Sequence, residues 1–329
     1  MNILVTGAAG FIGFHLVYAL NKLHKVKIIG IDNINNYYDT NLKKNRLKIL
    51  KTDCKRFNFI KVDICDDKKL KYIFKNYKIN IVIHLAAQAG VRYSIENPKK
   101  YLNTNIAGFF NIINFSTIFK IKHLIYASSS SVYGNSNSFP LGETADTSNP
   151  LSFYASTKKS NEIIAHSFNM IHNLKCTGLR FFTVYGPFGR PDMSLFKFCD
   201  SIVKSRKINL FNKGKHMRDF TYIDDVVKSI ILILNKKNNK NEHDIYNICS
   251  KNPKSLKTFV NLIEKNLNKK SKVKFLNIQK GDVYKTHGNN DRLVKYTKYK
   301  NFTPIEIGIP KFVKWYNEYY NKKIIKYFI

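Results

Sequence analysis

The alternation of short apolar segments with helical patterns is the feature that most limits what this chain can fold into. Helical spacing of apolar residues covers 11–23, 98–119 and 152–171. Short apolar runs predict strands at 2–6, 26–31, 57–62, 81–85, 123–127 and 177–182. Strands that alternate with helices pair in parallel, because each helix carries the chain back to the same edge of the sheet. We therefore predict an α/β fold with a doubly wound parallel (Rossmann) sheet.

The pattern becomes irregular after about residue 182, where glycine and proline cluster at 186–191. We predict a dinucleotide-binding Rossmann domain over 1–181. A smaller C-terminal substrate-binding lobe is expected over 182–329, partly interleaved with the sheet. The Lys/Asn run at 236–241 is typical of a solvated loop.

The charge of the chain is strongly positive, with 56 Lys+Arg against 22 Asp+Glu and a formal net charge of +34. Such a charge would suit a nucleic-acid or acidic-membrane partner. However, the lysines are scattered along the whole chain rather than gathered in one arm. The chain is also rich in Asn and Ile, which share A/T-rich codons with Lys. We interpret the charge as compositional drift and expect no nucleic-acid partner, although the positive field would attract a phosphate-bearing substrate.

The cysteines and the N-terminal segment indicate in which cellular compartment the protein works. The five cysteines are Cys54, Cys65, Cys176, Cys199 and Cys249. Their odd number and wide spacing disfavour a disulfide framework or a zinc site, and no metal is expected. The N-terminal segment does not have the pattern of a signal peptide, and no apolar run approaches the ~18 residues of a membrane span. We expect a cytoplasmic protein without a membrane anchor.

Gly7, Gly10 and Gly13 lie between the first predicted strand and the first predicted helix. Glycine lets such a turn tighten and lets a dinucleotide pyrophosphate approach the backbone. At a helix N-terminus, free N–H groups and the helix dipole favour the anion. A glycine triplet by itself also suits an ordinary tight turn between a strand and a helix.

Two aspartates end the second and third predicted strands. Asp32 could accept both hydroxyls of a ribose and would repel a 2′-phosphate, which favours NAD over NADP. An ordinary strand-end turn residue is the alternative for Asp32. Asp63 could accept a hydrogen bond from an adenine amino group, or it could cap a helix over 65–76.

Tyr154 and Lys158 form a Y-x-x-x-K pair, which lies on one face of a helix. The ammonium group would lower the pKa of the phenol toward working pH, and an oxidised nicotinamide would add more positive charge. Ser129 belongs to a serine run, 128–131, directly after an apolar strand. A hydroxyl at that strand end is placed to hydrogen-bond the same reacting oxygen as the phenol.

With these motifs, the chain resembles the extended short-chain dehydrogenase/reductase family, in its nucleotide-sugar epimerase branch. The matching segments are 7–13, 84–88, 127–134, 154–158 and 218–225. Within that branch the chain is most similar to UDP-glucuronate 4-epimerases. That similarity rests on 88–94, 179–187, 189–193, 195–198, 281–283 and 311–316.

The resemblance implies a redox-neutral inversion at C4 of UDP-glucuronate, giving UDP-galacturonate through a 4-keto sugar. Tyr154 as phenolate would take the proton from O4, while hydride passes to tightly held NAD and returns to the other face of the turned sugar. Ser129 would bridge Tyr154 and O4, with Ser130 beside it. Lys158 would also hold the nicotinamide ribose.

The resemblance also implies contacts to cofactor and substrate. The expected NAD-binding residues are Gly7, Gly10, Phe11, Ile12, Gly13, Asp32, Asn33, Asp63, Ile64, Leu85, Ala86, Ala87, Gln88, Asn105, Tyr154 and Lys158. The expected substrate-binding residues are Ser129, Ser130, Thr183, Arg190, Arg218 and Asp282.

Arg218 matches the arginine that clamps the UDP diphosphate, a task suited to a bidentate guanidinium. The alternative for it is a surface salt bridge with Asp219 or Asp224. Thr183 and Arg190 are the candidates for the C6 carboxylate, because a uronate needs a donor or cation that a neutral hexose does not. The alternative for Arg190 is a solvated loop residue.

One departure from the family concerns the C-terminal segment. Related epimerases for neutral sugars often carry a second arginine just before its Gly-Asp, whereas Gln279 and Lys280 precede Gly281 here. Lys280 would serve with less geometric precision.

Other functions share parts of the same pattern. A C4 epimerase of a neutral UDP-hexose, UDP-glucose or UDP-N-acetylglucosamine, uses the same machinery. Dehydratases and decarboxylases of the family usually place an acidic residue near the serine run, and 128–134 has none. A non-catalytic RNA-binding relative would tend to lose Tyr154 and Lys158, and both are present. The family pairs helices near 99–118 and 152–171, so we expect a homodimer.

Overall fold

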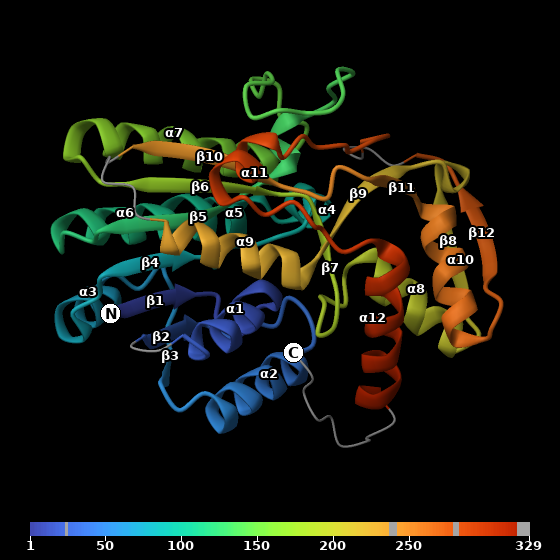
Figure 1. The fold of residues 1–329 in the computed structure, drawn as a ribbon, viewed down its shortest axis with the longest axis horizontal. Helices are drawn as coiled ribbons and strands as arrows, with labels where there is room; N and C mark the ends of the chain where they lie inside the picture. The colour runs from blue at the N-terminus through green and yellow to red at the C-terminus, as the bar shows by residue number, and fades with distance from the viewer. Residues whose placement is uncertain (24–25, 237–241, 279–282, 321–329) are drawn as a thin grey trace.

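A computed structural model describes residues 1–23, 26–236, 242–278 and 283–320 of the chain. Its centre is a seven-stranded sheet in the order β10-β6-β5-β4-β1-β2-β3, with every neighbouring pair parallel (Figure 1). The strands are β1 (Asn2–Thr6), β2 (Lys27–Asp32), β3 (Phe57–Lys61), β4 (Ile81–His84), β5 (His123–Ser129), β6 (Cys176–Phe181) and β10 (His243–Ile248). The predicted parallel α/β fold is confirmed.

Helices cover both faces of the sheet, because alternate residues of the buried strands point to opposite sides. In β1, Ile3 and Val5 belong to one hydrophobic core and Leu4 to another. The first core receives α1 (Phe11–Asn21), α2 (Thr40–Asp53) and α9 (Ile223–Asn235). The second receives α3 (Asp67–Tyr77), α6 (Gly108–Ile118) and α7 (Phe153–His172).

A smaller group of elements packs beside the carboxyl ends of the strands, at the right of Figure 1. Its helices are α8 (Ser194–Val203), α10 (Leu256–Leu267) and α12 (Ile305–Tyr320). Its strands are β7 (Thr183–Tyr185), β8 (Lys207–Phe211), β9 (Met217–Tyr222), β11 (Pro253–Ser255) and β12 (Lys272–Leu276). The chain leaves this group to add β10 to the central sheet and to form α11 (Asp291–Thr297). The division at residue 181 stays a prediction.

The segment predicted as one helix over 98–119 has three parts. They are α5 (Pro98–Tyr101), a π-helical segment η1 (Leu102–Ala107) and α6, after a short helix α4 (Val91–Glu96). A π-helical insertion turns the following side chains relative to a regular helix and is common at functional sites. Here it carries Asn105, which lies beneath the cleft described below.

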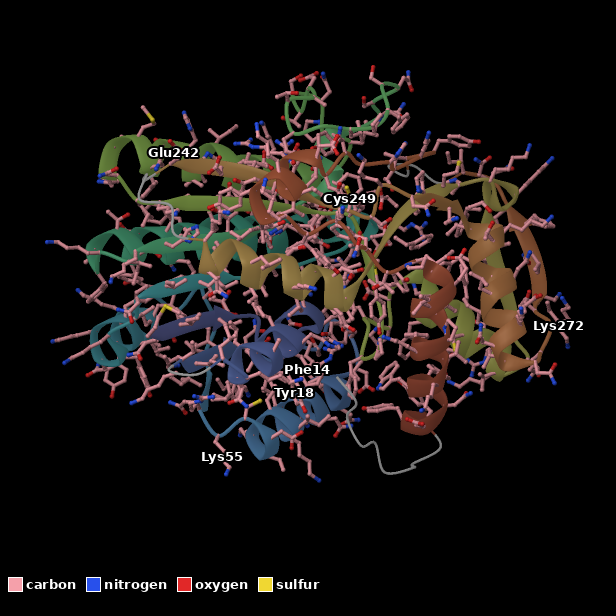
Figure 2. All side chains as sticks on the ribbon, in the orientation of Figure 1. Phe14, Tyr18, Lys55, Glu242, Cys249 and Lys272 are labelled. Atoms are coloured by element: carbon pink, nitrogen blue, oxygen red, sulfur yellow. The ribbon has the colours of Figure 1, made fainter. Side chains whose placement is uncertain are left out.

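Charged side chains extend from all sides of the molecule seen in Figure 2, although a few, such as Lys158 and Arg180, are buried. Lys55 and Lys272, labelled in Figure 2, lie at well-separated edges of it. This distribution fits the interpretation that the lysines do not form one binding arm. No helix in the described part of the chain is both long and apolar enough to cross a bilayer. The five cysteines are free, and only Cys65 is exposed. Of the 236–241 run, residues 237–241 lie outside the described residues.

Candidate active site

A large cleft opens at the carboxyl ends of the central strands, where parallel α/β sheets bind their ligands. It has a volume of about 1010 Å³, at the upper end of the range for a small-molecule site. Nineteen of the residues expected to bind cofactor or substrate line it. They are Gly7, Gly10, Phe11, Ile12, Gly13, Asp32, Asn33, Ile64, Leu85, Ala86, Ala87, Gln88, Ser129, Ser130, Tyr154, Lys158, Thr183, Arg190 and Arg218. The sequence motifs therefore converge on one site.

The glycine-rich turn forms a cradle of bare backbone at one end of the cleft. Gly7 has a positive φ of 71°, and a Cβ on it would lie 2.8 Å from the Ala86 backbone nitrogen. A Cβ on Gly13 would lie 2.1 Å from the Gly7 carbonyl oxygen. Helix α1 begins directly after Gly10, with no side-chain cap on its first N–H groups. Such a turn can take the pyrophosphate of a dinucleotide.

Asp32 is held in a fixed orientation at the end of β2. Its carboxylate accepts hydrogen bonds from the backbone nitrogens of Ile34 at 2.8 Å and Ala9 at 3.1 Å. Burial raises the pKa of Asp32, while these hydrogen bonds and the charge of Lys43 lower it. Asp32 thus acts as a turn residue and also lines the cleft, so its two alternative interpretations do not exclude each other. A carboxylate at this place fits the ribose of NAD.

Asp63 and Asn105 do not line the cleft. Asp63 accepts from the Asn33 side-chain amide at 2.8 Å and from the Cys65 backbone nitrogen at 2.8 Å. It does not cap a helix over 65–76, because Asp66 caps α3, which begins at residue 67. Asp63 therefore contributes through Asn33, which does line the cleft.

Asn105 lies one layer below the cleft, where its side chain bonds the backbone of Gln88. Its Oδ1 accepts from the Gln88 backbone nitrogen at 2.8 Å, and its Nδ2 donates to the Gln88 carbonyl oxygen at 3.0 Å. The Nδ2 also donates to the Thr157 hydroxyl at 3.0 Å, which ties the π-helical segment to α7. Asn105 thus supports Gln88 from behind. Asp282 and Lys280 lie outside the described residues.

Tyr154, Lys158 and Ser129 meet at the middle of the cleft. Tyr154 lies in the first turn of α7, which Ser152 caps by accepting from the Ala155 backbone nitrogen at 3.1 Å. Lys158 is buried and donates from Nζ to the carbonyl oxygen of Ala127 at 2.8 Å. The Ser129 hydroxyl hydrogen-bonds the Tyr154 phenol. This is the arrangement that the spacing of the two motifs predicts.

The prediction about the pKa of Tyr154 is contradicted. Burial raises the pKa of Tyr154 above its ordinary value, and the opposing effects come from the Ser129 hydrogen bond and the charge of Arg190. Burial also lowers the pKa of Lys158 to about 8. The Lys158 ammonium is directed at the Ala127 carbonyl, so within this chain it does not lower the pKa of the phenol as we expected.

Arg218 is ordered on β9 by contacts to neighbouring groups. Its Nη1 donates to the carbonyl oxygens of Met217 at 2.9 Å and Tyr284 at 3.1 Å, and its Nη2 contacts His216 Nδ1 at 3.0 Å. The Asp219 carboxylate, one of its two alternative surface partners, is fully buried. That carboxylate accepts from Ser250 at 2.8 Å.

Arg190 is not a solvated loop residue, because its side chain is 22 % exposed and lines the cleft. Its guanidinium donates to both carboxylate oxygens of Asp192, with the Nε to Oδ1 distance 3.0 Å. Tyr37 donates from its hydroxyl to Asp192 Oδ2 at 3.1 Å and comes from the other half of the chain. Sequence reasoning missed both partners. The Arg-x-Asp spacing was a visible signal for Asp192, whereas nothing local indicated Tyr37.

Comparison with known proteins agrees with this site. Residues 3–249 match the NAD dependent epimerase/dehydratase family. The chain is 46% identical to Protein CapI of Staphylococcus aureus over 98% of this chain and 100% of that protein. It is 41% identical to UDP-glucuronate 4-epimerase 4 of Arabidopsis thaliana over 98% of this chain and 76% of that protein.

A solved structure is similar over nearly the whole chain. It is UDP-glucuronic acid 4-epimerase from Bacillus cereus in complex with UDP-glucuronic acid and NAD, with a TM-score of 0.92. The sequences are 31% identical, over 97% of this chain and 100% of that one. The expected resemblance is therefore confirmed, and the chain belongs to the NAD dependent epimerase/dehydratase family.

Proposed function

We propose that this chain catalyses the NAD-dependent inversion of UDP-glucuronate at C4, which yields UDP-galacturonate. The observation that carries the proposal is the grouping of Tyr154, Ser129 and Arg190 in one cleft, with the Arg190 charge acting on the Tyr154 phenol. A base at O4 with a cation close by suits a sugar that bears a carboxylate near the reacting carbon.

The cofactor would lie along the glycine turn and Asp32. The turn provides bare backbone and a helix N-terminus for the pyrophosphate, and Asp32 provides acceptors for the ribose hydroxyls. NAD bound there would supply a reversible hydride acceptor for C4 of the sugar. The overall reaction is redox-neutral, so no second substrate is required.

The side chains at the centre of the cleft handle the proton. Tyr154 in its phenolate form takes the proton from O4 and later gives it back, and Ser129 bridges the phenol and O4. Burial raises the pKa of Tyr154 in the chain alone, so the positive charge of a bound nicotinamide ring would help to form the phenolate. Lys158, whose ammonium donates to the Ala127 carbonyl, would orient the nicotinamide ribose.

The other end of the cleft would hold the substrate. Arg218 is the candidate for the diphosphate, because a guanidinium can bind two phosphate oxygens at once. Thr183 and Arg190 are the candidates for the C6 carboxylate, and both line the cleft. The sugar must turn about its diphosphate linkage between the two half-reactions, so the anchor at Arg218 has to hold while the ring is released.

The proposal includes a homodimer, a cytoplasmic location and a role in polysaccharide biosynthesis. Large apolar side chains are exposed on α6 and α7: Phe110 47%, Ile118 56%, Ile163 58%, Met170 71% and Ile171 71%. Such a patch supports pairing of these helices with a second copy. Light scattering at micromolar concentration should give the mass of a dimer, and a monomer there would refute this part.

Proton NMR that resolves the anomeric signals tests the reaction directly. UDP-glucuronate incubated with the protein and catalytic NAD should give UDP-galacturonate without net NADH, and Tyr154→Phe should not turn over. Loss of carbon dioxide to a pentose would place the chain among decarboxylases. Turnover of UDP-glucose or UDP-N-acetylglucosamine, but not of UDP-glucuronate, would keep the chemistry and remove the role of Thr183 and Arg190.

A further inference from the structure

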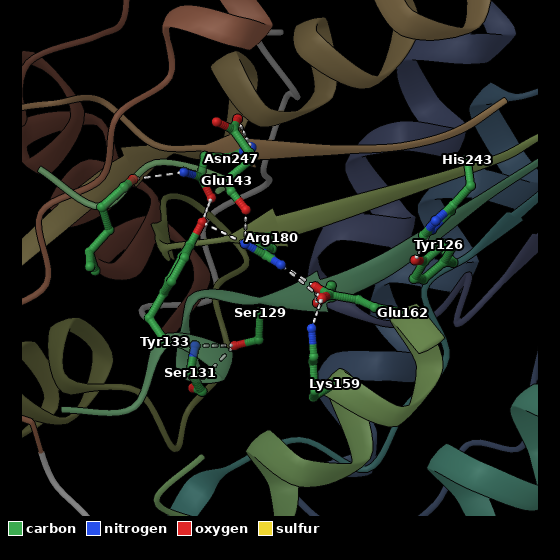
Figure 3. A network of polar contacts seen from close by, with 12 residues as sticks. Tyr126, Ser129, Ser131, Tyr133, Glu143, Lys159, Glu162, Arg180, His243 and Asn247 are labelled. Atoms are coloured by element: carbon green, nitrogen blue, oxygen red, sulfur yellow. Dashed lines mark hydrogen bonds and ion pairs between the residues drawn. The ribbon is translucent and has the colours of Figure 1, made fainter. Parts of the chain in front are cut away.

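A buried polar network lies directly behind the catalytic side chains. At its centre Arg180, on β6, pairs with Glu162, on α7, through Nε to Oε1 at 2.8 Å and Nη2 to Oε2 at 2.9 Å (Figure 3). The two side chains are only 3% and 2% exposed. Taking an ion pair this far from water is costly unless hydrogen bonds satisfy the remaining atoms. We call Ser128, Tyr133, Glu162, Arg180 and Asn247 the Arg180 network.

The Arg180 network holds the turn that carries Ser129 at both of its ends. Before the turn, the Ser128 hydroxyl donates to Glu162 Oε1 at 2.6 Å. At its end, the Tyr133 hydroxyl accepts from Arg180 Nη1 at 2.9 Å and donates to Asn247 Oδ1 at 2.6 Å. Between them, Ser129 caps the 3₁₀ turn η2 (Ser130–Tyr133) by accepting from the Ser131 backbone nitrogen at 3.2 Å. The position of the Ser129 hydroxyl therefore depends on both anchors.

The same network also holds the helix that carries Tyr154. Tyr154, Lys158 and Glu162 are spaced four residues apart on α7, so they follow one side of that helix. Lys158 joins this side to β5 at Ala127, and Glu162 joins it to β5 at the next residue, Ser128. Two successive turns of α7 are thus fastened to the strand whose end presents Ser129.

We propose that Ser128, Glu162 and Arg180 are positioning residues that keep the Ser129 hydroxyl and the Tyr154 phenol at hydrogen-bonding distance. Their polar groups are directed at one another, so they act through the turn at 129–133 and through α7. A hydrogen bond between two groups on separate elements requires those elements to be held to a fraction of an ångström, and a displacement of about 1 Å can cost 10²-fold in rate. The inference rests on the proposed function, in which Ser129 bridges Tyr154 and O4.

Ser128→Ala is the most informative variant, because it breaks the link between Glu162 and the strand but leaves the ion pair intact. Ser116→Ala is its matched control, since the Ser116 hydroxyl is equally buried and bonds only its own helix, at Ile112 O, 2.7 Å away. We expect Ser128→Ala to lower kcat roughly 10-fold with KM for UDP-glucuronate within about twofold. Ser116→Ala should leave both constants unchanged. Equal kcat in the wild type and Ser128→Ala would overturn the proposal.

A second measurement does not depend on turnover. Tyrosine labelled with carbon-13 at Cζ gives an NMR signal for Tyr154, identified by its loss in Tyr154→Phe. Ser128→Ala and Glu162→Gln should shift this signal and its titration, and Ser116→Ala should not. An unshifted signal in a folded Ser128→Ala protein would overturn the positioning role even if the wild type were inactive. A shifted signal together with an inactive wild type would reject only the proposed function.

Discussion

Two arginine–carboxylate pairs in this protein have similar chemistry and different surroundings. Arg180 and Glu162 are 3% and 2% exposed and come from a strand and a helix of the central fold. Arg190 and Asp192 are 22% and 24% exposed and come from the same loop beside the cleft. The first pair joins two elements of the core, whereas the second lines the cleft. The two roles that we propose, positioning and binding, therefore differ in burial rather than in residue type.

The groups that contact Arg180 and Arg190 also differ between the buried pair and the pair at the cleft. Arg180 reaches Glu162, Tyr133 and the carbonyl oxygen of Glu143, at 3.1 Å, so its donors are directed at fixed protein groups. The described partners of Arg190 are Asp192 and Tyr37, which bonds the same carboxylate and whose ring centroid lies 5.9 Å from the guanidinium carbon. Burial lowers the pKa of both guanidinium groups, but the facing carboxylates and tyrosines outweigh it and raise both above the ordinary value. Both therefore stay charged, and only Arg190 lines the cleft.

The largest expected difference between the pairs is in stability. Glu162→Ala leaves the Arg180 charge buried without its carboxylate and should lower the free energy of unfolding by about 3–5 kcal/mol. Asp192→Ala should lower it by about 1 kcal/mol or less, because water can reach Arg190. Urea denaturation of both variants makes the comparison, with the exposed Asp291→Ala as the control. Equal losses for Glu162→Ala and Asp192→Ala would remove the distinction.

The next effect is on substrate choice. Arg190→Ala removes charge-assisted hydrogen bonds worth about 1.5–3 kcal/mol, so kcat/KM for UDP-glucuronate should fall roughly 10- to 100-fold. Turnover of UDP-glucose, if any, should fall much less, because with that sugar only the effect of the Arg190 charge on the pKa of Tyr154 is lost. The unfolding midpoint should stay close to that of the wild type. Steady-state kinetics on both sugars provide the measurement. A similar loss on the two sugars would mean that Arg190 does not read the carboxylate.

The third prediction concerns the pH dependence of stability, which should differ between buried histidines of the central sheet and the Arg190–Asp192 pair of the loop. Burial, together with the charges of Lys158 and Lys175, lowers the pKa of His84 and His123 to about 3. The unfolded chain therefore binds more protons between pH 6.5 and 3, and stability falls as the pH drops below 6.5. Each histidine contributes up to about 1.4 kcal/mol per pH unit.

The loop pair should respond differently over that range. Burial would raise the pKa of Asp192, but the charge and hydrogen bonds of Arg190 outweigh it and the pKa lies below its ordinary value. Its contribution to stability is therefore lost only below about pH 4. Urea denaturation at pH 7, 6 and 5 gives the free energy of unfolding as a function of pH. We expect this free energy to fall less steeply with decreasing pH in His123→Gln than in the wild type, and equally steeply in Asp192→Asn. An equally steep fall in His123→Gln and the wild type would contradict the prediction.

The smallest effect is expected at Tyr37. Tyr37→Phe removes one hydrogen bond to Asp192, worth about 0.5–1 kcal/mol. Arg190 should then be held less firmly over the cleft, and KM for UDP-glucuronate should rise a few-fold. Tyr77→Phe, on α3 and outside the residues that line the cleft, is the control. No change in KM would show that Asp192 alone orients Arg190.

The residues that meet in the cleft could be predicted because their signals are local. Gly7, Gly10 and Gly13 follow a strand and begin a helix, and Tyr154 and Lys158 are one helical turn apart. A parallel sheet brings the ends of its strands to one edge, so Asp32 and Ser129 reach the same cleft without any knowledge of packing. Motifs that are far apart in the sequence therefore lie in one site because the strands are parallel.

Other parts depended on which segments become neighbours in space. β10, 67 residues after the start of β6, pairs with β6 because the C-terminal lobe returns the chain to the sheet edge. The direction of the Tyr154 pKa shift also depended on burial, which outweighs the charges near the phenol. The relative size of the burial effect and the charge effects on the pKa cannot be found from the spacing of Tyr154 and Lys158 or from their residue types.

The sequence by itself determined the fold class, the place of the cleft and the grouping of Ser129, Tyr154 and Lys158 in it, because strand–helix periodicity and strand-end motifs are local properties of the chain. The tertiary structure alone decided which arginine is buried and which lines the cleft. Arg180 and Arg190 are ten residues apart and similar in kind. They differ because one lies on a strand covered on both faces and the other on a loop at the edge of the cleft, and solvent access is a property of the packed molecule.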